Sequence, residues 1–468
     1  MTLPPFARRT AMATVTAATA LAMLALTGCA SFSSDGGFGQ VAQLTKDRTG
    51  QTPVVQRQPE QTQAAAERVA QLLSQPLSAH SSVEIALLNN RGLQARYAEL
   101  GIAEADLVRA GRLANPSLRF GRLSGNSNGH NSIEIDRAVV FNVLGLLTLP
   151  LAQQLEQQRF EQVQMQAALA TVSLATDTRK AFFEAVAAQQ LVGYHGQVKD
   201  AADASNDLAR RMVAAGNFSK LSQMREQAFY ADATAQLTRA QHQAVATRER
   251  LVRLLGLSSA GAKAFTLPAR LPDLPNAPAE RQDAEQTAMT TRLDVLMAKR
   301  HTEATARALG LTNATRFVNV LQAGYQNKSA TGEQRSNGFE IELELPLFDF
   351  GSTRTAQAEG TYLQAVHRTA QVAVNARSEV REAYSAYRTA HALALHYRDE
   401  VVPLRQRISE ENLLRYNGML ISVFDLLADA REQVAGVSAA VEALRDYWTA
   451  ETQLQAAMTA ASAHGEQP

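Results

Sequence analysis

The chain shows the same succession of patterns twice, about 205 residues apart, which is far longer than the roughly 20–50 residues of a solenoid repeat. Each copy has a helix-like run, a short hairpin of alternating apolar and polar residues, and a very long alanine-rich helical run that turns back once at a glycine. Gly216 follows Pro150 at nearly the same distance as Gly418 follows Gly351. The sequence therefore predicts a duplicated unit of domain size, with four short strands and two very long helical hairpins.

The amino-terminal residues have the pattern of an export signal. Arg8 and Arg9 precede an apolar run that ends in Leu-Thr-Gly-Cys29. A basic start, a short apolar core and small residues before a cleavage site predict a signal peptide over residues 1–28 rather than a spanning helix. The Leu-x-Gly-Cys ending resembles the bacterial lipobox, which implies a diacylglycerol and an N-acyl chain on Cys29. An ordinary signal followed by a stray cysteine, or twin-arginine export, are the alternatives.

Two further observations favour the lipid anchor. Cys29 is the only cysteine in 468 residues, so it has no partner for an intramolecular disulfide although export leads to an oxidising compartment. Ala30 rather than an aspartate follows it, which in the enterobacterial sorting rule implies the outer membrane. We therefore expect a protein that is lipid-anchored in the cell outer membrane and extends into the periplasm.

The composition excludes several classes of protein. The 46 basic and 45 acidic residues leave a net charge of +1, which argues against a nucleic-acid partner. No apolar run after residue 28 approaches the roughly 18–20 residues that a spanning helix needs, so any membrane crossing would use strands. Aromatic residues make up only 6% of the chain, while alanine is abundant. This mixture is typical of long helices that pack through thin seams.

The patterns divide the chain into expected segments. A stretch containing four prolines separates the two copies, because proline continues neither a helix nor a central strand. The segments after the signal peptide are a lipid-anchored extended tail (29–77), a first repeat (78–260) with a hairpin at 115–149 and a helical tip near residue 216, a proline-rich linker (261–285), a second repeat (286–460) with a hairpin at 316–347 and a tip near 418, and a C-terminal tail (461–468).

Heptad spacing along the long runs predicts coiled-coil packing. Steps of three and four residues keep one seam toward a partner helix and favour a left-handed supercoil. A helix of about 66 residues would be about 100 Å long, which suits a span across the periplasm. The two predicted seams are Leu221, Met224, Ala228, Ala231 and Ala235, and Val380, Ala383, Tyr387, Ala390, Ala394 and Tyr397.

The four strands predict an oligomer. A strand in lipid must have every backbone group hydrogen-bonded, so a membrane sheet has to close into a barrel. The smallest known barrels need about eight strands, and three copies of this chain would supply twelve. The expected fold is a membrane α+β protein: a trimer with a 12-strand transmembrane β-barrel, four strands per chain, continued by a long α-helical coiled-coil tunnel, with two structural repeats per chain.

Several motifs resemble those of the TolC-type outer-membrane efflux factor family, over nearly all of the mature chain. The motifs lie within the first helix, at a strand start, at a strand exit and at the two helical turns of the repeat pattern. The matching strings are Ala86-Leu-Leu-Asn-Asn90, Ala114-Asn-Pro-Ser-Leu118, Glu344-Leu-Pro-Leu-Phe-Asp-Phe-Gly351, Arg415-Tyr-Asn-Gly-Met-Leu-Ile-Ser-Val-Phe-Asp-Leu-Leu427 and, more weakly, Ala214-Ala-Gly-Asn-Phe-Ser219.

The resemblance implies a homotrimeric exit duct of a tripartite efflux system, which takes cargo from an inner-membrane pump through a periplasmic adaptor protein across the outer membrane. It also implies that the helical tip turns dock the adaptor. These turns comprise Gly216, Asn217, Phe218, Ser219, Gly418, Met419, Leu420 and Ser422. A duct for protein secretion, or a structural envelope lipoprotein, are alternative functions. The second alternative would not need the four alternating strands.

In the second turn, Gly418 departs from the family pattern and Asp425 has two possible roles. Gly418 lies one residue earlier, relative to Ser422, than the family glycine. Asp425 matches the first of two aspartates that form a periplasmic gate in some members, while Ala428 occupies the position of the second. The alternative role for Asp425 is to stabilise a helix N-terminus through the helix dipole, by about 0.3–1 kcal/mol.

The sequence gives no indication of an enzyme, a cofactor or a metal site. It contains no His-Glu-x-x-His, no Gly-x-Ser-x-Gly and no phosphate-binding glycine loop. His391 and His396 are five residues apart on a predicted helix, so they do not share a face suited to binding one metal ion.

The second hairpin carries a column of acidic residues. Glu340, Glu342 and Glu344 alternate with apolar residues, and in a membrane barrel the apolar set faces lipid, so the glutamates would face the lumen. Three copies would form acidic rings that favour cations, and Glu134 and Asp136 fit the same pattern in the first hairpin. Neutralisation by Arg119 or Arg137 is the alternative.

Overall fold

The structure is a computed structural model that describes residues 31–127, 130–258, 261, 265–281, 283–315, 320–344 and 348–460. It divides into two compact units. Unit 1 comprises residues up to Phe38, Ala98–Gln164 and Met297–Ala370, and unit 2 comprises Gly39–Tyr97, Met165–Leu296 and Gln371 onward. Cys29, the predicted signal peptide and the predicted C-terminal tail lie outside the described residues.

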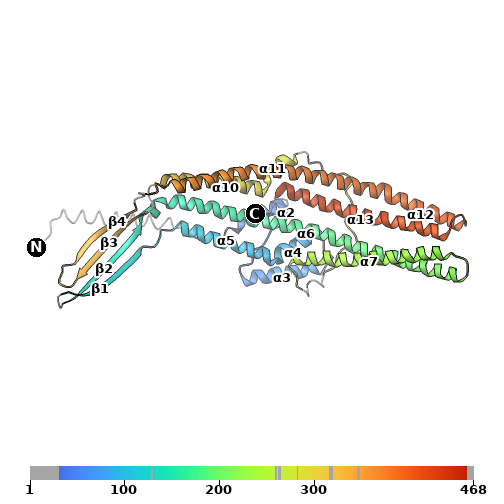
Figure 1. The fold of residues 1–468 in the computed structure, drawn as a ribbon, viewed down its shortest axis with the longest axis horizontal. Helices are drawn as coiled ribbons and strands as arrows, with labels where there is room; N and C mark the ends of the chain where they lie inside the picture. The colour runs from blue at the N-terminus through green and yellow to red at the C-terminus, as the bar shows by residue number, and fades with distance from the viewer. Residues whose placement is uncertain are drawn as a thin grey trace. The chain divides into compact units, whose positions relative to one another are not determined.

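Unit 1 contains a four-stranded antiparallel sheet in the order β1-β2-β3-β4 (Figure 1). The strands are β1 (Ser117–Ser127), β2 (His130–Asn142), β3 (Leu321–Ala330) and β4 (Ser336–Leu343). β2 and β3 are about 180 residues apart in sequence yet pair side by side, which is possible because antiparallel strands need no fixed crossover. The two predicted hairpins therefore join into one sheet, whose edges are β1 and β4.

Long helices make up most of the remaining structure. The division between the units falls within α5, α6, α10 and α11, and after the first residue of α2. The helices are α2 (Phe38–Thr49), α3 (Pro59–Leu73), α4 (Ala79–Asn89), α5 (Arg91–Ala110), α6 (Val143–Ala214), α7 (Lys220–Leu255), α9 (Ala284–Thr291), α10 (Leu293–Thr315), α11 (Ser352–His396), the π-helix η1 (Tyr397–Val401), α12 (Val402–Asn417) and α13 (Val423–Thr459).

Three expectations about element bounds are wrong. The segment 29–77 is not an extended tail, because residues 38–49 and 59–73 are helical. The first hairpin ends at Asn142 rather than near residue 149, and Pro150 lies inside α6 instead of preceding it. Pro150 is the eighth residue of α6, past its first turn, so α6 continues there without one i→i−4 hydrogen bond.

The helix that opens each repeat is broken, and the break binds the end of the return helix. In repeat 1 the break is at Asn90, whose Nδ2 donates to the Leu254 carbonyl (3.0 Å), while Asn89 Nδ2 donates to Leu255 (3.0 Å) and Gly256 (2.7 Å). These carbonyls belong to the C-terminus of α7, where a helix leaves four of them without intrahelical partners. The Asn-Asn pair of the first helix therefore caps a helix distant in sequence.

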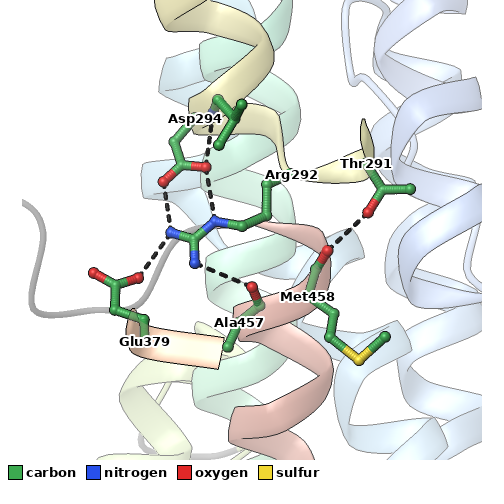
Figure 2. Close-up of polar contacts among 7 residues, drawn as sticks. Thr291, Arg292, Asp294, Glu379, Ala457 and Met458 are labelled. Carbon is green, nitrogen blue, oxygen red and sulfur yellow. Dashed lines mark hydrogen bonds and ion pairs between the residues drawn. The ribbon is translucent and has the colours of Figure 1, made fainter. Parts of the chain in front are cut away.

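Repeat 2 uses an arginine at the corresponding break (Figure 2). The Arg292 side chain is 1% exposed, and its Nη1 donates to the Ala457 carbonyl at the end of α13 (3.1 Å). The guanidinium also donates two hydrogen bonds to Asp294 (2.9 and 2.6 Å) and one to Glu379 (2.8 Å). Thr291 Oγ1 donates to the next carbonyl, that of Met458 (2.8 Å). A buried charge needs such a complete set of partners.

The core of unit 2 combines small, aliphatic and aromatic side chains, many of them on the long helices. Phe183 of α6 stacks on Trp448 of α13, with ring centroids 5.4 Å apart. Five of the six positions of the predicted seam, from Val380 to Ala394, are buried, so the prediction is confirmed there. The sixth position, Tyr397, is half-buried and begins η1. The seam predicted on α7 is wrong, because Leu221 and Met224 are exposed while Glu226 and Ala233 are buried.

Among the described residues, no helix is both long enough and apolar enough to cross a membrane.

Candidate functional site

The sheet has one strongly apolar face. Antiparallel register places Leu118, Val139, Tyr325 and Phe339 in one row across the four strands. Phe120, Phe141, Ile341 and Leu343 share that face, because side chains two residues apart along a strand point the same way. Phe339 is 86% and Ile341 74% exposed. Large apolar side chains exposed in such numbers mark a surface that meets lipid or protein; we call it the apolar face.

The opposite face of the sheet, the polar face, carries most of its charges. It includes Arg119, Glu134, Asp136, Lys328, Glu340 and Glu342. Glu344 continues the column just past β4, and its backbone N–H donates to the Val320 carbonyl (3.2 Å). The predicted parity of the acidic column is thus present, with three glutamates on one face of the strand that ends the sheet.

Charges in the first hairpin are arranged differently from the expectation. Asp136 lies directly opposite Lys328 of β3, and their side chains approach to 3.9 Å. Arg137 points to the apolar face instead, where its Nη1 donates to Asn327 Oδ1 (3.2 Å). Lys328 therefore offsets one acid of the polar face, a role that the sequence analysis had assigned only to Arg119 or Arg137. The alternation of β3 was the signal that could have identified Lys328.

The first helical turn is closed by a glycine, as predicted. Gly216 has φ +77°, a left-handed conformation that costs glycine little because it has no Cβ. The Asn217 N–H donates to the Met212 carbonyl (2.9 Å), which completes the end of α6. Ser219 then caps α7, since its Oγ accepts from the Ser222 N–H (3.1 Å).

In the second turn the left-handed residue is not a glycine. Gly418 has φ −79°, and the positive φ, +58°, belongs to Met419. Met419 lies three residues before the capping Ser422, as Gly216 lies three before Ser219, so methionine occupies the glycine position of the first turn. This explains the displaced Gly418. Met419 and Leu420 are 94% and 77% exposed.

Asp425 caps the N-terminus of α13. Its Oδ2 accepts hydrogen bonds from the Ser422 N–H (3.0 Å) and Oγ (2.7 Å), while the Asp425 N–H donates to Ser422 Oγ (3.2 Å). This reciprocal arrangement is a capping box. The Ser422 hydrogen bonds hold the pKa of the Asp425 carboxyl below its ordinary value. The geometry thus fits the helix-capping role, while the gate role stays a prediction.

The two helical hairpins of unit 2 contact each other near their turns. Phe218 stacks on Phe424 with centroids 3.9 Å apart. Farther from the turns, Arg431 Nη2 of α13 donates to both carboxylate oxygens of Glu226 on α7 (3.0 and 3.1 Å), and Ser205 Oγ of α6 donates to the same carboxylate (2.6 Å). Glu226 is 4% exposed. This buried ion pair was not predicted from the sequence, because Glu226 lies off the apolar pattern of α7.

His391 has a structural partner: its Nε2 lies 2.9 Å from the Pro275 carbonyl of the linker. Within the described ranges, no group of three or more His, Cys, Asp or Glu side chains could hold a metal ion.

Comparison with solved structures identifies the fold. The outer membrane protein VceC of Vibrio cholerae is 16% identical, with a TM-score of 0.68 over 81% of this chain and 95% of its own. The MtrE outer membrane channel of Neisseria gonorrhoeae is 16% identical, with a TM-score of 0.67 over 86% and 91%. The CmeC outer membrane channel of Campylobacter jejuni is 13% identical, with a TM-score of 0.65 over 86% and 87%. No protein-family model and no curated protein sequence matches the chain.

These similarities define the class of fold. Four antiparallel strands and long helical hairpins, matched across most of both chains, are the TolC-type fold of outer-membrane channels. The predicted fold class is confirmed at this level.

Proposed function

We propose that the chain is the outer-membrane channel of a tripartite efflux system and works as a homotrimer. The observation that carries this proposal is the four-stranded sheet with an exposed apolar face and a charged face. A sheet in lipid cannot keep open edges, and three copies supply the twelve strands of a closed barrel. The apolar face would meet lipid and the polar face would line the lumen.

The helical hairpins supply the periplasmic part of this proposal. The 72-residue α6 is about 108 Å long at 1.5 Å per residue, so a tunnel of such helices reaches far from the membrane. The exposed turns at Gly216–Ser219 and Gly418–Ser422 form its mouth, where a periplasmic adaptor docks and connects the channel to an inner-membrane pump. Acyl chains on Cys29 would add a lipid anchor.

Cations are the favoured cargo class at the lumen. Lys328 offsets Asp136, but Glu340 and Glu342 have no cationic side chain opposite them in the register, where they face Gly324 and Gln322. Three copies would place these carboxylates in acidic rings, and such rings favour cations. Asp425 remains a candidate gate residue only if it leaves its capping box when the tunnel opens.

Single-channel recording in asymmetric salt tests the function. The purified protein should form pores with a reversal potential of the sign for cations, and Glu342→Gln should shift that potential toward zero. Glu333→Gln, which removes the same charge from the turn after β3, is the matched control and should leave it unchanged. Absence of pores would refute the channel, while an anion-selective pore, or one insensitive to Glu342→Gln, would refute the cation preference alone.

A further inference from the structure

The two edge strands of the sheet carry opposite charges on the same face. On the polar face, β1 has one charged side chain, Arg119, beside the uncharged Ser117, Gly121 and Leu123. The column along β4 is acidic and comprises Glu340, Glu342 and Glu344. Arg119 is aligned with Ala138, Gln326 and Gly338 across the sheet. Three strand spacings of about 4.8 Å separate it from β4, so Arg119 is out of reach of the acidic column within its own chain.

The strands are also staggered in a consistent direction. β4 begins at Ser336, which aligns with Gly121, while β1 continues about six residues farther, to Ser127. The opposite end of the sheet is the one where the strands adjoin the helices. There β1 begins at Ser117, which aligns with Glu340, while β4 continues about three residues farther toward the helices, to Leu343. Over three strand-to-strand steps, β4 is thus displaced toward the helices by about 4.5 residues, or about 1.5 residues per step.

A closed ring of identical copies fixes where β1 of one copy meets β4 of the next. One more step of about 1.5 residues brings the displacement to about six residues per copy. The displacement has to be an even number of residues, because side chains alternate between the two faces along a strand. An odd number would pair Arg119 with a residue of the apolar face. Arg119 of the partner subunit would then lie beside Glu344 rather than Gly338, with Glu342 as its diagonal neighbour, within reach of a long side chain.

We infer that a second copy of this chain docks along the β4 edge through an ion pair between the partner subunit's Arg119 and Glu344. This inference rests on the proposed trimeric barrel and adds its register and its charge pairing. The same contact repeats at each of the three seams. It also divides the acidic column by role, since Glu344 holds the seam while Glu340 and Glu342 remain directed at the cargo.

Disulfide trapping in the full-length protein in its membrane tests the register. Oxidation of the double variant Arg119→Cys/Glu344→Cys should give covalent dimers and trimers on a non-reducing gel. Arg119→Cys/Gly338→Cys is the matched control. Its two cysteines lie on the same face and the same two strands, but they would meet only if neighbouring copies paired without the displacement. This variant should stay monomeric on the gel. Single-cysteine variants check that Cys29 does not contribute.

The outcomes separate the seam from the trimer. Cross-linking of the Gly338 pair but not the Glu344 pair, with a trimeric native mass, would overturn the seam and keep the proposed function. A monomeric native mass with neither pair cross-linked would overturn both.

Charge exchange gives a second, independent readout. Arg119→Glu should lower the temperature at which the trimer dissociates in detergent, because it opposes like charges at three seams. The exchange Arg119→Glu/Glu344→Arg should restore that temperature, and Arg122→Gln on the other face of β1 should not change it. Failure of the exchange to restore the temperature would contradict the ion pair.

Discussion

At the residue scale, the second helical turn contains the clearest local strain. A left-handed conformation brings the Cβ of an L-residue too close to the following carbonyl and costs about 1–2 kcal/mol, yet Met419 adopts it with φ +58°. A fully exposed apolar residue held in this way favours a function for its side chain, which fits the proposed adaptor-docking role of the turn.

Met419→Gly should therefore stabilise the second turn, by about 1 kcal/mol or slightly less because glycine also gains freedom in the unfolded chain. Hydrogen exchange of the Leu420 amide, which donates to the Arg415 carbonyl (2.8 Å), should become slower. Gly216→Ala is the reciprocal control. Nothing lies within 4 Å of its added Cβ, so strain alone should speed exchange of the Asn217 amide. Faster exchange at Leu420 in Met419→Gly would contradict this account.

The Glu226–Arg431 pair should be the most sensitive polar contact between the hairpins. Arg431→Gln removes the cationic partner of the buried Glu226 carboxylate, which keeps the hydrogen bond from Ser205. We expect a loss of about 2–3 kcal/mol, discounted because the Arg431 side chain is 33% exposed. The additional change Glu226→Gln should recover much of this loss.

Arg445→Gln is the matched control for that prediction. Arg445 pairs with Asp446, its neighbour on the same helix, so its loss should cost at most about 1 kcal/mol. Thermal unfolding of the three variants is the measurement, and equal effects of Arg431→Gln and Arg445→Gln would show that the buried pair contributes nothing special.

At the element scale, the N-terminal segment docks onto unit 1 through a close approach at Gly37. The Ser33 N–H and Oγ donate to the buried Glu104 (2.6 and 2.5 Å), and Gln164 Nε2 donates to the Gly37 carbonyl (2.8 Å). Gly37 has φ +71°, and a Cβ there would overlap the Phe160 ring.

Gly37→Ala should accordingly release this segment and expose it to limited proteolysis. Gly50→Ala is matched in backbone conformation, with φ +71° and nothing within 4 Å of the added Cβ. It should show only the strain of about 1–2 kcal/mol and no new cleavage near residues 33–38. Equal protection of both variants would show that the contact with Phe160 does not hold the segment.

The same scale shows what the sequence could and could not predict. The alternation of β4 and the seam from Val380 to Ala394 were readable because each element has one dominant environment. α2 was missed because its segment is polar overall, although Phe38, Val41 and Thr45 recur at helical spacing and are buried. The prediction of the α7 seam was wrong because it was based on apolar residues, whereas one buried position of α7 is the charged Glu226.

Sites that depend on long-range packing were the hardest to predict. Nothing local marks Arg292 or Glu226 as buried, since Arg292 reaches Ala457 and Glu226 pairs with Arg431 on helices distant in sequence. The left-handed position of Met419 was hidden because glycine, the usual signal for that conformation, stands one residue earlier. The displaced glycine was nevertheless visible in the sequence, and comparison with the first turn could have located the strained residue.

At the scale of the whole molecule, the duplication explains the shared plan and its differences. Both repeats break their first helix and use that break to cap the return helix, with Asn89 and Asn90 in one and Arg292 in the other. The long helix is continuous in repeat 1, whereas in repeat 2 the π-helix η1 and Pro403 interrupt it. Short π-helical turns within α-helices, such as η1, often occur at functional sites.

The central claim is that this chain forms a channel by closing its four-stranded sheet with two further copies. Native mass spectrometry of the detergent-solubilised protein, combined with circular dichroism of the same sample, tests it most directly. The account predicts a mass close to three acylated chains together with intact strand signal. A stable monomer that keeps its strand signal would contradict the account, because it would show that a sheet with two open edges persists without a partner.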